Sequence, residues 1–401
     1  MSQSVVSQIV IKAAPAEVYL AFTRSLRLEQ WLCDFATVQP RPAGRMYLWW
    51  NGDFYSAGEY IQLEENKALK FKWHARFDPA PSEVAVLLGE EKDGTRVTMT
   101  HIVPDGEDWK ERAAGFKQEW DSTLPNLASL LETGLDRRIY DRPMLGIMVN
   151  DFNPEVARAL GIPVSEGIRL LNTIEGMGAR SAGLQQDDLV IEFNGKPITN
   201  DFGSLALALQ GKKGGDKVEV VFYRGPEKHN TTMELTRRAV PKIPAEPREL
   251  AAQLHVYYEQ AQKMLMDAFL GASEEEARFI PAQGEWSAIQ TLAHLVLVER
   301  EVLSNIDEVL GGFVRHSDEY GSNSTIHNEA IATAYGSVKN LLAEFKRLSE
   351  EVITYVSNLP EIFVTIKSDY LNLGNSLLNG SLPHTQGHIE QIKNAILAAR
   401  K

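Results

Sequence analysis

The sequence has a single cysteine, Cys33, among its 401 residues. This excludes an intrachain disulfide framework and any metal site built from several cysteines. No window approaches about 18 uninterrupted apolar residues, so no membrane-spanning helix is expected. The first residues contain neither a basic stretch nor an apolar core before a cleavage site, so no signal peptide is expected. Together these absences predict a cytoplasmic protein.

Positive charge is also scarce. The chain has 41 Lys and Arg residues against 54 Asp and Glu residues, which gives a formal net charge of −13. Because contact with phosphates requires clustered Lys and Arg, this balance argues against nucleic acid and anionic membranes as partners. The sequence contains no G-x-x-x-x-G-K-[ST] phosphate loop and no G-x-S-x-G nucleophile motif, so neither nucleotide hydrolysis nor serine-hydrolase chemistry is indicated.

Two proline-bearing stretches divide the chain. Leu135–Pro143 is charged and ends in proline, and Ala239–Pro247 has three prolines in nine residues, which suits a stiff, extended connector. They predict domains at residues 1–138, 139–240 and 246–401. The last part holds 21 of the acidic residues and 12 of the basic ones, so most of the negative charge lies there.

The three parts have different patterns, and together they predict a multidomain protein. The first begins with a strand, Val5–Ile11, and a helix that starts at Pro15. After further strands it ends in a long amphipathic helix containing Phe116, Trp120 and Leu127, which predicts an α+β fold with the helix against the sheet. The second part is a small β-rich module. The third has four long amphipathic segments, typical of an all-α four-helix bundle, at Arg248–Leu270, Ser287–Leu310, Asn328–Leu359 and Leu377–Ala399.

Three histidines in the last part could hold a metal ion. His384 and His388 are four residues apart, so on a helix both imidazoles lie on one face. His294 lies in an apolar stretch of the second helix and could face them. Three neutral imidazoles with one open position are the ligand set of a catalytic zinc site, and nickel or another divalent ion could also bind. The alternative is that His294 is a hydrogen-bonded core histidine and that the pair lies on the surface by chance.

The residues around these histidines resemble the DinB-like superfamily of four-helix bundles, which includes metal-dependent thiol S-transferases. The resemblance rests on Trp286-Ser287, on Ala293-His294-Leu295, and on the H-x3-H sequence that ends at Gln391-Ile392. It implies that His294, His384 and His388 are metal ligands. Two departures bear on their geometry: Pro383 directly precedes the first histidine of the pair, and Gly387 stands where many members have another histidine.

The second part resembles a bacterial, HtrA-like PDZ domain. Gly176–Leu184 (GMGARSAGL) carries the resemblance, and Asp187 stands where glycine is usual. The resemblance implies a carboxylate-binding loop at Met144–Ile147 and a peptide added as a strand beside it, facing a helix. The implied partner is the C-terminal peptide of another protein, contacted by Leu145, Gly146, Ile147, Val149, Leu205 and Leu209. The alternative is that Leu145 and Ile147 only pack the core and that the groove is empty or filled by the chain itself.

The first part resembles the SRPBCC superfamily (START-like, helix-grip), nearest to proteins like the activator of the heat-shock protein 90 ATPase. The resemblance rests on Ala14–Tyr19, on Leu28 to Trp31 and on the closing helix from Trp120 to Gly134. It implies an apolar cavity between sheet and helix for a small molecule or a client protein. The candidate lining residues are Trp31, Trp49, Trp73 and Trp120. The alternative is that these aromatic side chains only fill the core.

Two functions of different classes remain open. The chain is either a binding protein that combines a ligand- or client-binding module, a peptide-binding module and a metal-holding bundle, or a metal-dependent enzyme of the thiol S-transferase kind whose other domains recruit substrate. The sequence assigns no catalytic residue, because all three folds host varied roles.

Overall fold

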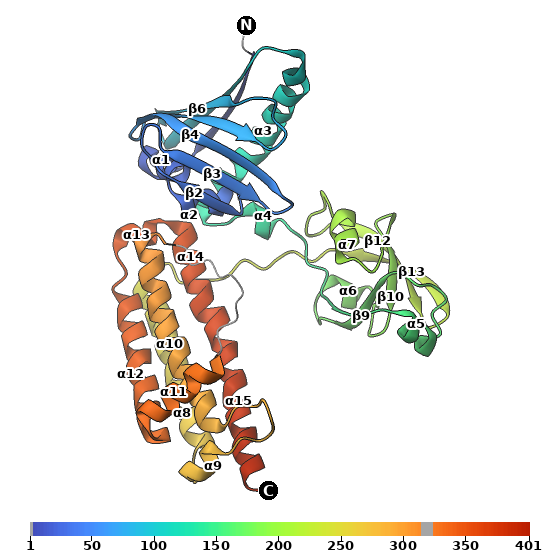
Figure 1. Cartoon of the computed structure of the whole chain (residues 1–401), viewed down its shortest axis with the longest axis vertical. Coiled ribbons are helices and arrows are strands. Elements are labelled where there is room, and N and C mark those ends of the chain that lie inside the picture. The colour runs from blue at the N-terminus through green and yellow to red at the C-terminus, as the bar shows by residue number, and fades with distance from the viewer. Residues whose placement is uncertain (1–2, 314–323) are drawn as a thin grey trace. The chain divides into compact units, whose positions relative to one another are not determined.

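The structure is a computed structural model that describes residues 3–313 and 324–401 (Figure 1). It divides into two compact units. One unit comprises residues 1–134 together with 241–401, and the other comprises residues 135–240. The second unit is therefore an insertion in the sequence of the first. None of the helices in the described ranges is long and apolar enough to cross a membrane.

The N-terminal part of the first unit is an antiparallel sheet of seven strands in the order β1-β7-β6-β5-β4-β3-β2. Buried and exposed residues alternate along β6 and β7, as expected for a sheet with one covered face. The strands are β1 (Gln3–Ile11), β2 (Phe35–Val38), β3 (Arg45–Trp50), β4 (Phe54–Glu64), β5 (Ala68–Ala75), β6 (Ser82–Glu91) and β7 (Gly94–Val103).

Three helices accompany this sheet: α1 (Pro15–Thr23), α2 (Ser25–Trp31) and α3 (Lys110–Thr133). A short 3-10 turn, η1 (Glu107–Trp109), precedes α3. The α3 helix lies against the sheet through buried Phe116, Trp120 and Leu127, so the expected α+β architecture is confirmed. It ends at Gly134, whose positive φ of 80° is the left-handed conformation that favours glycine.

The C-terminal part is helical. Its main helices form a closed ring in which α8 contacts α12, α12 contacts α10, α10 contacts α15, and α15 contacts α8. They enclose one apolar core. The elements are α8 (Pro247–Ala268), α9 (Glu274–Arg278), α10 (Ala288–Gly311), α11 (Ser324–Tyr335), α12 (Val338–Ser357), α13 (Glu361–Thr365), α14 (Lys367–Asn375), the π-helical segment η2 (Ser376–Ser381) and α15 (Leu382–Ala399).

Two of the four expected segments begin or divide differently from the prediction. The segment expected over Asn328–Leu359 is two helices, because Gly336 adopts a φ of 75° and the Ser337 hydroxyl caps α12 by accepting the Asn340 N–H. The last α-helix starts at Leu382 rather than near Leu377, since the preceding turn is π-helical. The prediction missed both because the apolar pattern continues across each break.

The N-terminal sheet domain and the bundle contact each other within the first unit. Arg27 of α2 donates to both carboxylate oxygens of Asp369 on α14, at 2.8 and 2.6 Å. The Gln30 side-chain amide also donates to Asp369, at 2.6 Å. Asp369 is only 3% exposed, and the bidentate ion pair with Arg27 balances its buried negative charge.

The second unit is a β-rich module whose sheet runs in the order β13-β12-β10-β9-β8, with β11 paired to β10. Asp187 has a φ of 68°, which explains why glycine is the usual residue there. The elements are α4 (Arg137–Tyr140), β8 (Ile147–Asn150), α5 (Pro154–Leu160), β9 (Ile168–Thr173), α6 (Gly178–Ser181), β10 (Leu189–Phe193), β11 (Lys196–Pro197), α7 (Phe202–Ala208), β12 (Lys217–Arg224) and β13 (Glu227–Glu234).

Candidate metal centre

Helix α10 carries His294 into the bundle from a well-defined start. Ser287 is the N-cap: its hydroxyl accepts the Gln290 N–H, and the Gln290 side chain accepts the Ser287 N–H. This capping box satisfies backbone donors at the helix end. The helix ends at Gly312, which has a φ of 72°. His294 lies two turns into α10 and is half-buried.

His384 and His388 lie one turn apart in the first half of α15. Pro383 is the second residue of α15, and because α15 follows η2 without a break, the N–H that this proline lacks is missing from a continuous helical run. The π-helical segment η2 lies directly before this proline, and both histidines follow it on the same α-helix. A Cβ at Gly387 would meet nothing within 4 Å, so glycine is not required there for space.

The three imidazoles converge. The Nε2 atoms of His294 and His384 are 3.4 Å apart, and those of His384 and His388 are 3.1 Å apart. One ligand atom from each of the three residues lies within 4.8 Å of the others. Nitrogens bound at about 2.05 Å in tetrahedral geometry are about 3.3 Å apart, and cis nitrogens of an octahedral ion about 2.9 Å apart. The donor set and its spacing therefore fit one divalent ion.

The electrostatics of the cluster favour neutral imidazoles. Burial, helped by the neighbouring His388 and His384 rings, lowers the pKa of His294 to about 4. Burial and the nearby His388 ring also lower the pKa of His384. A neutral imidazole has a free lone pair for a metal, whereas a protonated one does not. The lone pairs of His294 and His384 are therefore available near neutral pH.

Two neighbouring side chains, Gln391 and Trp286, orient the histidine rings. The Oε1 atom of Gln391 lies 2.8 Å from Nδ1 of His388. Because an amide oxygen only accepts, Nδ1 carries the proton and Nε2 presents its lone pair to the cluster. The Trp286 ring lies 5.0 Å from the His294 ring and 6.1 Å from the His388 ring, and its indole N–H donates to Thr325 on α11. The sequence pattern includes Trp286 and Gln391 but does not reveal these contacts.

A second polar group lies in the bundle core five residues after His294. Glu299 is buried, and its carboxyl accepts the Tyr258 hydroxyl at 2.7 Å. Burial raises the pKa of Glu299 to about 7. The sequence analysis did not single out Glu299, because a glutamate within an amphipathic helix is usually exposed.

Two buried polar groups of the bundle have unused hydrogen-bonding capacity. In the part of the chain that the structure describes, no partner is present for Nδ1 of His294 or for the side-chain amide of Asn328 on α11. When Nε2 of His294 binds a metal, Nδ1 carries a proton that requires an acceptor. An ordered water is the kind of group that supplies such an acceptor.

The candidate peptide-binding residues of the second unit lie on β8, in the loop before it, and on or directly after α7. Strand β8 ends the sheet order and contains Ile147 and Val149. Gly146, just before it, has a φ of 73°, and a Cβ there would lie 2.3 Å from Cβ of Met177. Leu145 and Leu205 are buried in the core of this unit. Ile147 and Leu209 are partly buried against the same core.

The candidate cavity residues of the first domain lie mainly in its core. Trp31 is fully buried and its indole N–H donates to the Ala21 carbonyl, while Trp73 and Trp120 pack edge to face at 5.5 Å. Trp49 is only partly buried, because alternation along β3 places it on the face opposite to buried Leu48. Trp50 lies on the inner face instead, 6.0 Å from the Trp73 ring.

His101 lies among these aromatic side chains and is fully buried. Its Nδ1 accepts the Trp120 indole N–H at 3.1 Å, so Nε2 carries the proton and donates to the Ser82 hydroxyl at 2.8 Å. The Ser82 hydroxyl in turn donates to the Trp73 carbonyl. Burial, and secondly the Arg112 charge, lower the pKa of His101 to about 3. Both ring nitrogens are therefore occupied by protein groups.

Three family models match the chain in series. A model described as "Activator of Hsp90 ATPase homolog 1-like protein" matches residues 12–132. A PDZ-domain model matches residues 143–235, and a DinB-superfamily model matches residues 257–392. The chain carries an Hsp90-activator-like domain, a PDZ domain and a DinB-like bundle. All three resemblances found in the sequence are confirmed, and so are the three fold classes.

Curated relatives match over the PDZ domain alone. The chain is 29% identical over 109 residues to a "Probable periplasmic serine endoprotease DegP-like" of Marinomonas sp. (strain MWYL1), covering 27% of this chain and 23% of that protein. It is 29% identical over 83 residues to the periplasmic pH-dependent serine endoprotease DegQ of Escherichia coli (strain K12), covering 21% and 18%. The chain thus spans less than a quarter of the length of these relatives.

Solved structures match about a third of the chain. Protein MLL2253 from Mesorhizobium loti is 25% identical, with a TM-score of 0.30, over 32% of this chain and 97% of that one. The Aha1 dimer from Colwellia psychrerythraea is 21% identical, with a TM-score of 0.29, over 32% of this chain and 96% of that one.

Proposed function

We propose that the chain is a multidomain binding protein whose DinB-like bundle holds one divalent metal ion through Nε2 of His294, His384 and His388. The convergence of these three atoms, with Nε2 separations of 3.4 and 3.1 Å, carries the proposal. Zinc and nickel both suit imidazole ligands. When bound, the ion would act as a Lewis acid on a fourth ligand such as water or a thiol.

The protein residues would prepare this site before the ion arrives. The pKa of His294, lowered to about 4 by burial, keeps its imidazole neutral. Gln391 holds the Nδ1 proton of His388, which fixes the orientation of the ring. Trp286 packs against His294 and His388 and shields one side of the site from water. His384 is exposed, so a fourth ligand can reach the ion from solvent.

Elemental analysis of the purified full-length chain tests the metal site. We expect about one divalent ion per chain in the wild type, and little or none in His294→Ala, His384→Ala and His388→Ala. His255→Ala is the matched control, since His255 lies on α8 of the same bundle outside the cluster and pairs with Glu259. Protein that contains no metal and takes up neither zinc nor nickel would disprove the proposal.

The PDZ domain would bind the C-terminal peptide of a partner protein. Strand β8 ends the sheet and offers an edge to which a peptide can add as a strand, and the Gly146 loop precedes that edge. The Hsp90-activator-like domain would bind an apolar small molecule or a client protein. We also propose a cytoplasmic location, which the scarcity of cysteine, with Cys33 alone in the sequence, supports.

A library of C-terminal peptides tests the PDZ proposal. Peptides with a free carboxylate should bind, whereas C-terminally amidated versions should not, because the loop would recognise the terminal charge. Gly146→Val should abolish binding. Gly176→Val is the control for backbone strain, since Gly176 has a similar φ of 77° but open space around a Cβ. No binding by any free-carboxylate peptide would refute this part of the proposal.

A second candidate function is metal-dependent transfer of a low-molecular-weight thiol onto an electrophile. The exposure of His384 favours it, because a thiol could reach the ion from solvent. The metal-loaded chain would be assayed with glutathione and 1-chloro-2,4-dinitrobenzene. Turnover that requires the metal and disappears in His294→Ala would support an enzyme. Absence of turnover with this and other low-molecular-weight thiols would leave the binding function alone.

A further inference from the structure

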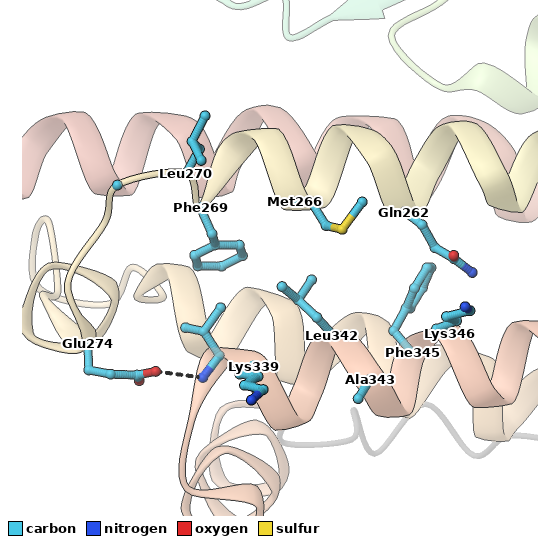
Figure 2. Close-up of a pocket in the computed structure, with 12 residues that line it drawn as sticks. Gln262, Met266, Phe269, Leu270, Glu274, Lys339, Leu342, Ala343, Phe345 and Lys346 are labelled. Atoms are coloured by element: carbon cyan, nitrogen blue, oxygen red, sulfur yellow. Dashed lines mark hydrogen bonds between the residues drawn. The ribbon is translucent and has the colours of Figure 1, made fainter.

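The bundle has an apolar groove of about 560 Å³ between α8 and α12, at the sequence positions where α8 ends and α12 begins. Figure 2 shows Met266 and Phe269 pointing from α8 toward Leu342 and Phe345 on α12. Phe345 is fully buried, whereas Met266 is 57% exposed and Leu270, at the end of α8, is 79% exposed. The groove therefore has a buried apolar floor and exposed apolar edges, and an exposed set of this kind marks a binding surface.

The side of the groove formed by α12 has a regular pattern. Lys339, Leu342, Ala343 and Lys346 are spaced i, i+3, i+4 and i+7, so they lie in one stripe along the helix. The small Ala343 allows another backbone to approach closely between the two lysines. The lysines themselves are seven residues apart, which corresponds to about 10.5 Å along a helix.

The lysines give this groove a positive side in an acidic domain. Residues 246–401 contain 21 acidic and 12 basic residues, yet two of the lining residues on α12 are lysines. Among the described residues Lys339 has no ion-pair partner, and Lys346 lies 3.7 Å from Glu350, which is itself mostly exposed. Glu274 also lines the groove. Its carboxylate accepts the Val338 N–H at 3.0 Å, which holds it at the start of α12.

We propose that this groove binds an acidic amphipathic α-helix of a partner protein. The apolar side chains of the partner would lie between α8 and α12, and two carboxylates seven residues apart would face Lys339 and Lys346. A helix suits an open groove because its apolar face is buried while its polar face stays in water. This site is separate from the histidine cluster and does not depend on a metal there.

The pattern also argues against two other occupants. A fatty acid has one carboxylate at one end of its chain and cannot engage two lysines that are two turns apart. A second copy of the same surface, packed antiparallel, would place lysines opposite lysines, and like charges in contact are unfavourable. Both alternatives give distinct results in the experiment.

The test uses the full-length chain and fluorescein-labelled, lactam-stapled helical peptides of 15 residues. Each peptide has leucine, phenylalanine or methionine on one face and two charged residues beside that face. We expect peptides with glutamates at i and i+7 to bind with a Kd of tens of micromolar, at least tenfold more tightly than peptides with lysines there. Peptides with glutamates at i and i+4 should also bind less tightly, because they match only one lysine. High salt should reduce the preference for glutamate.

Variants locate the binding site. Lys339→Glu combined with Lys346→Glu should weaken the glutamate peptides at least tenfold and improve the lysine peptides. Met266→Asp should weaken all of them, and the exposure of Met266 means that the bundle should still fold. Lys263→Glu is the control for charge reversal, because it reverses one lysine on α8 at a residue that does not line the groove.

Three outcomes would overturn the proposal. In the first, no peptide of the panel binds with a Kd below about 1 mM. In the second, binding occurs but Met266→Asp and the double charge reversal leave it unchanged. In the third, the groove has another occupant. Either analytical ultracentrifugation shows a wild-type dimer that Met266→Asp converts to a monomer, or dodecanoate binds in the groove while none of the peptides does.

Discussion

His101 in the Hsp90-activator-like domain and His294 in the DinB-like bundle are both flanked by aromatic rings, and burial is the first cause of a lowered pKa at each. They differ in what their nitrogens contact. Both nitrogens of His101 are hydrogen-bonded to Trp120 and Ser82. At His294, Nε2 faces His384, and Nδ1 has no partner in the described ranges.

This difference separates a structural histidine from a candidate ligand. A lowered pKa says only that the neutral imidazole is favoured, and it does so in both domains. Three converging imidazoles are a different observation: two neutral rings 3.1 Å apart can share an N–H···N hydrogen bond, whereas three ring nitrogens grouped together are the donor set of a metal site. The partners of the ring, rather than its burial, therefore identify the site.

The largest expected effect is at His101. His101→Ala should lower the free energy of unfolding of the N-terminal domain by about 4 kcal/mol, because it leaves a cavity and removes the partners of Ser82 and Trp120. Metal content should not change. Calorimetry of the full chain would measure the loss, with the exposed His74→Ala as control. A loss below about 1 kcal/mol would show that the histidine does not hold this core together.

The next effect concerns Glu299, whose contribution to the stability of the bundle depends on pH. Its folded pKa of about 7 lies above its ordinary value of 4.5, so the folded bundle retains a proton that the unfolded chain releases. Wild-type stability relative to Glu299→Gln should therefore fall as the pH rises from about 4.5 to about 7, by about 1.4 kcal/mol per unit and about 3 kcal/mol in all.

Denaturant titrations at several pH values would measure this difference, with the exposed Glu301→Gln on the same helix as control.

The stability that His101 contributes should have the opposite pH dependence. Its folded pKa of about 3 lies below the ordinary 6.5, so the stability it contributes is lost as the pH falls from about 6.5 to about 3. Parallel pH slopes for the two wild-type domains would contradict this pair of assignments.

A metal ion should stabilise the bundle but not the N-terminal domain. At a free zinc or nickel concentration of 100 times Kd, the wild-type bundle should gain about 2.7 kcal/mol, because the ion binds only the folded site. His294→Ala should gain nothing. Thermal unfolding with and without the ion would show the shift. An equal shift in the His294→Ala variant would indicate binding elsewhere.

The smallest effect is expected at Gln391. Gln391→Ala removes the acceptor of the His388 Nδ1 proton and should weaken metal binding about tenfold, or about 1.4 kcal/mol, without abolishing it. Competition with a fluorescent chelator would measure the affinity. Gln386→Ala, an exposed residue of the same helix, should leave the affinity unchanged. Loss of all metal in Gln391→Ala would mean that this residue is more than an orienting partner.

The sequence predicted the elements whose signals are local. The segment predicted over Ser287–Leu310 agrees closely with α10, which Ser287 caps at its start and Gly312 ends. The spacing of His384 and His388 places them on one helical face, and the family pattern adds His294. These predictions need only helix geometry and a matching motif.

Features that depend on packing were missed. The side of β3 that faces the core decides between Trp49 and Trp50, and a one-residue difference in register reverses that choice. The π-helical segment η2 and the break at Gly336 interrupt apolar patterns that continue on both sides. The burial of Glu299 follows from its pairing with Tyr258, 41 residues away, which no local window contains.

The ion pair between Arg27 and Asp369 has a thermodynamic consequence. Asp369 lies on α14, which continues through η2 into the helix that bears His384 and His388. If a molecule bound to the N-terminal domain changes the free energy of this ion pair, and the histidine cluster responds to the same change, the two binding equilibria are linked. Reciprocity then requires that the ion alter the affinity for that molecule by the same factor.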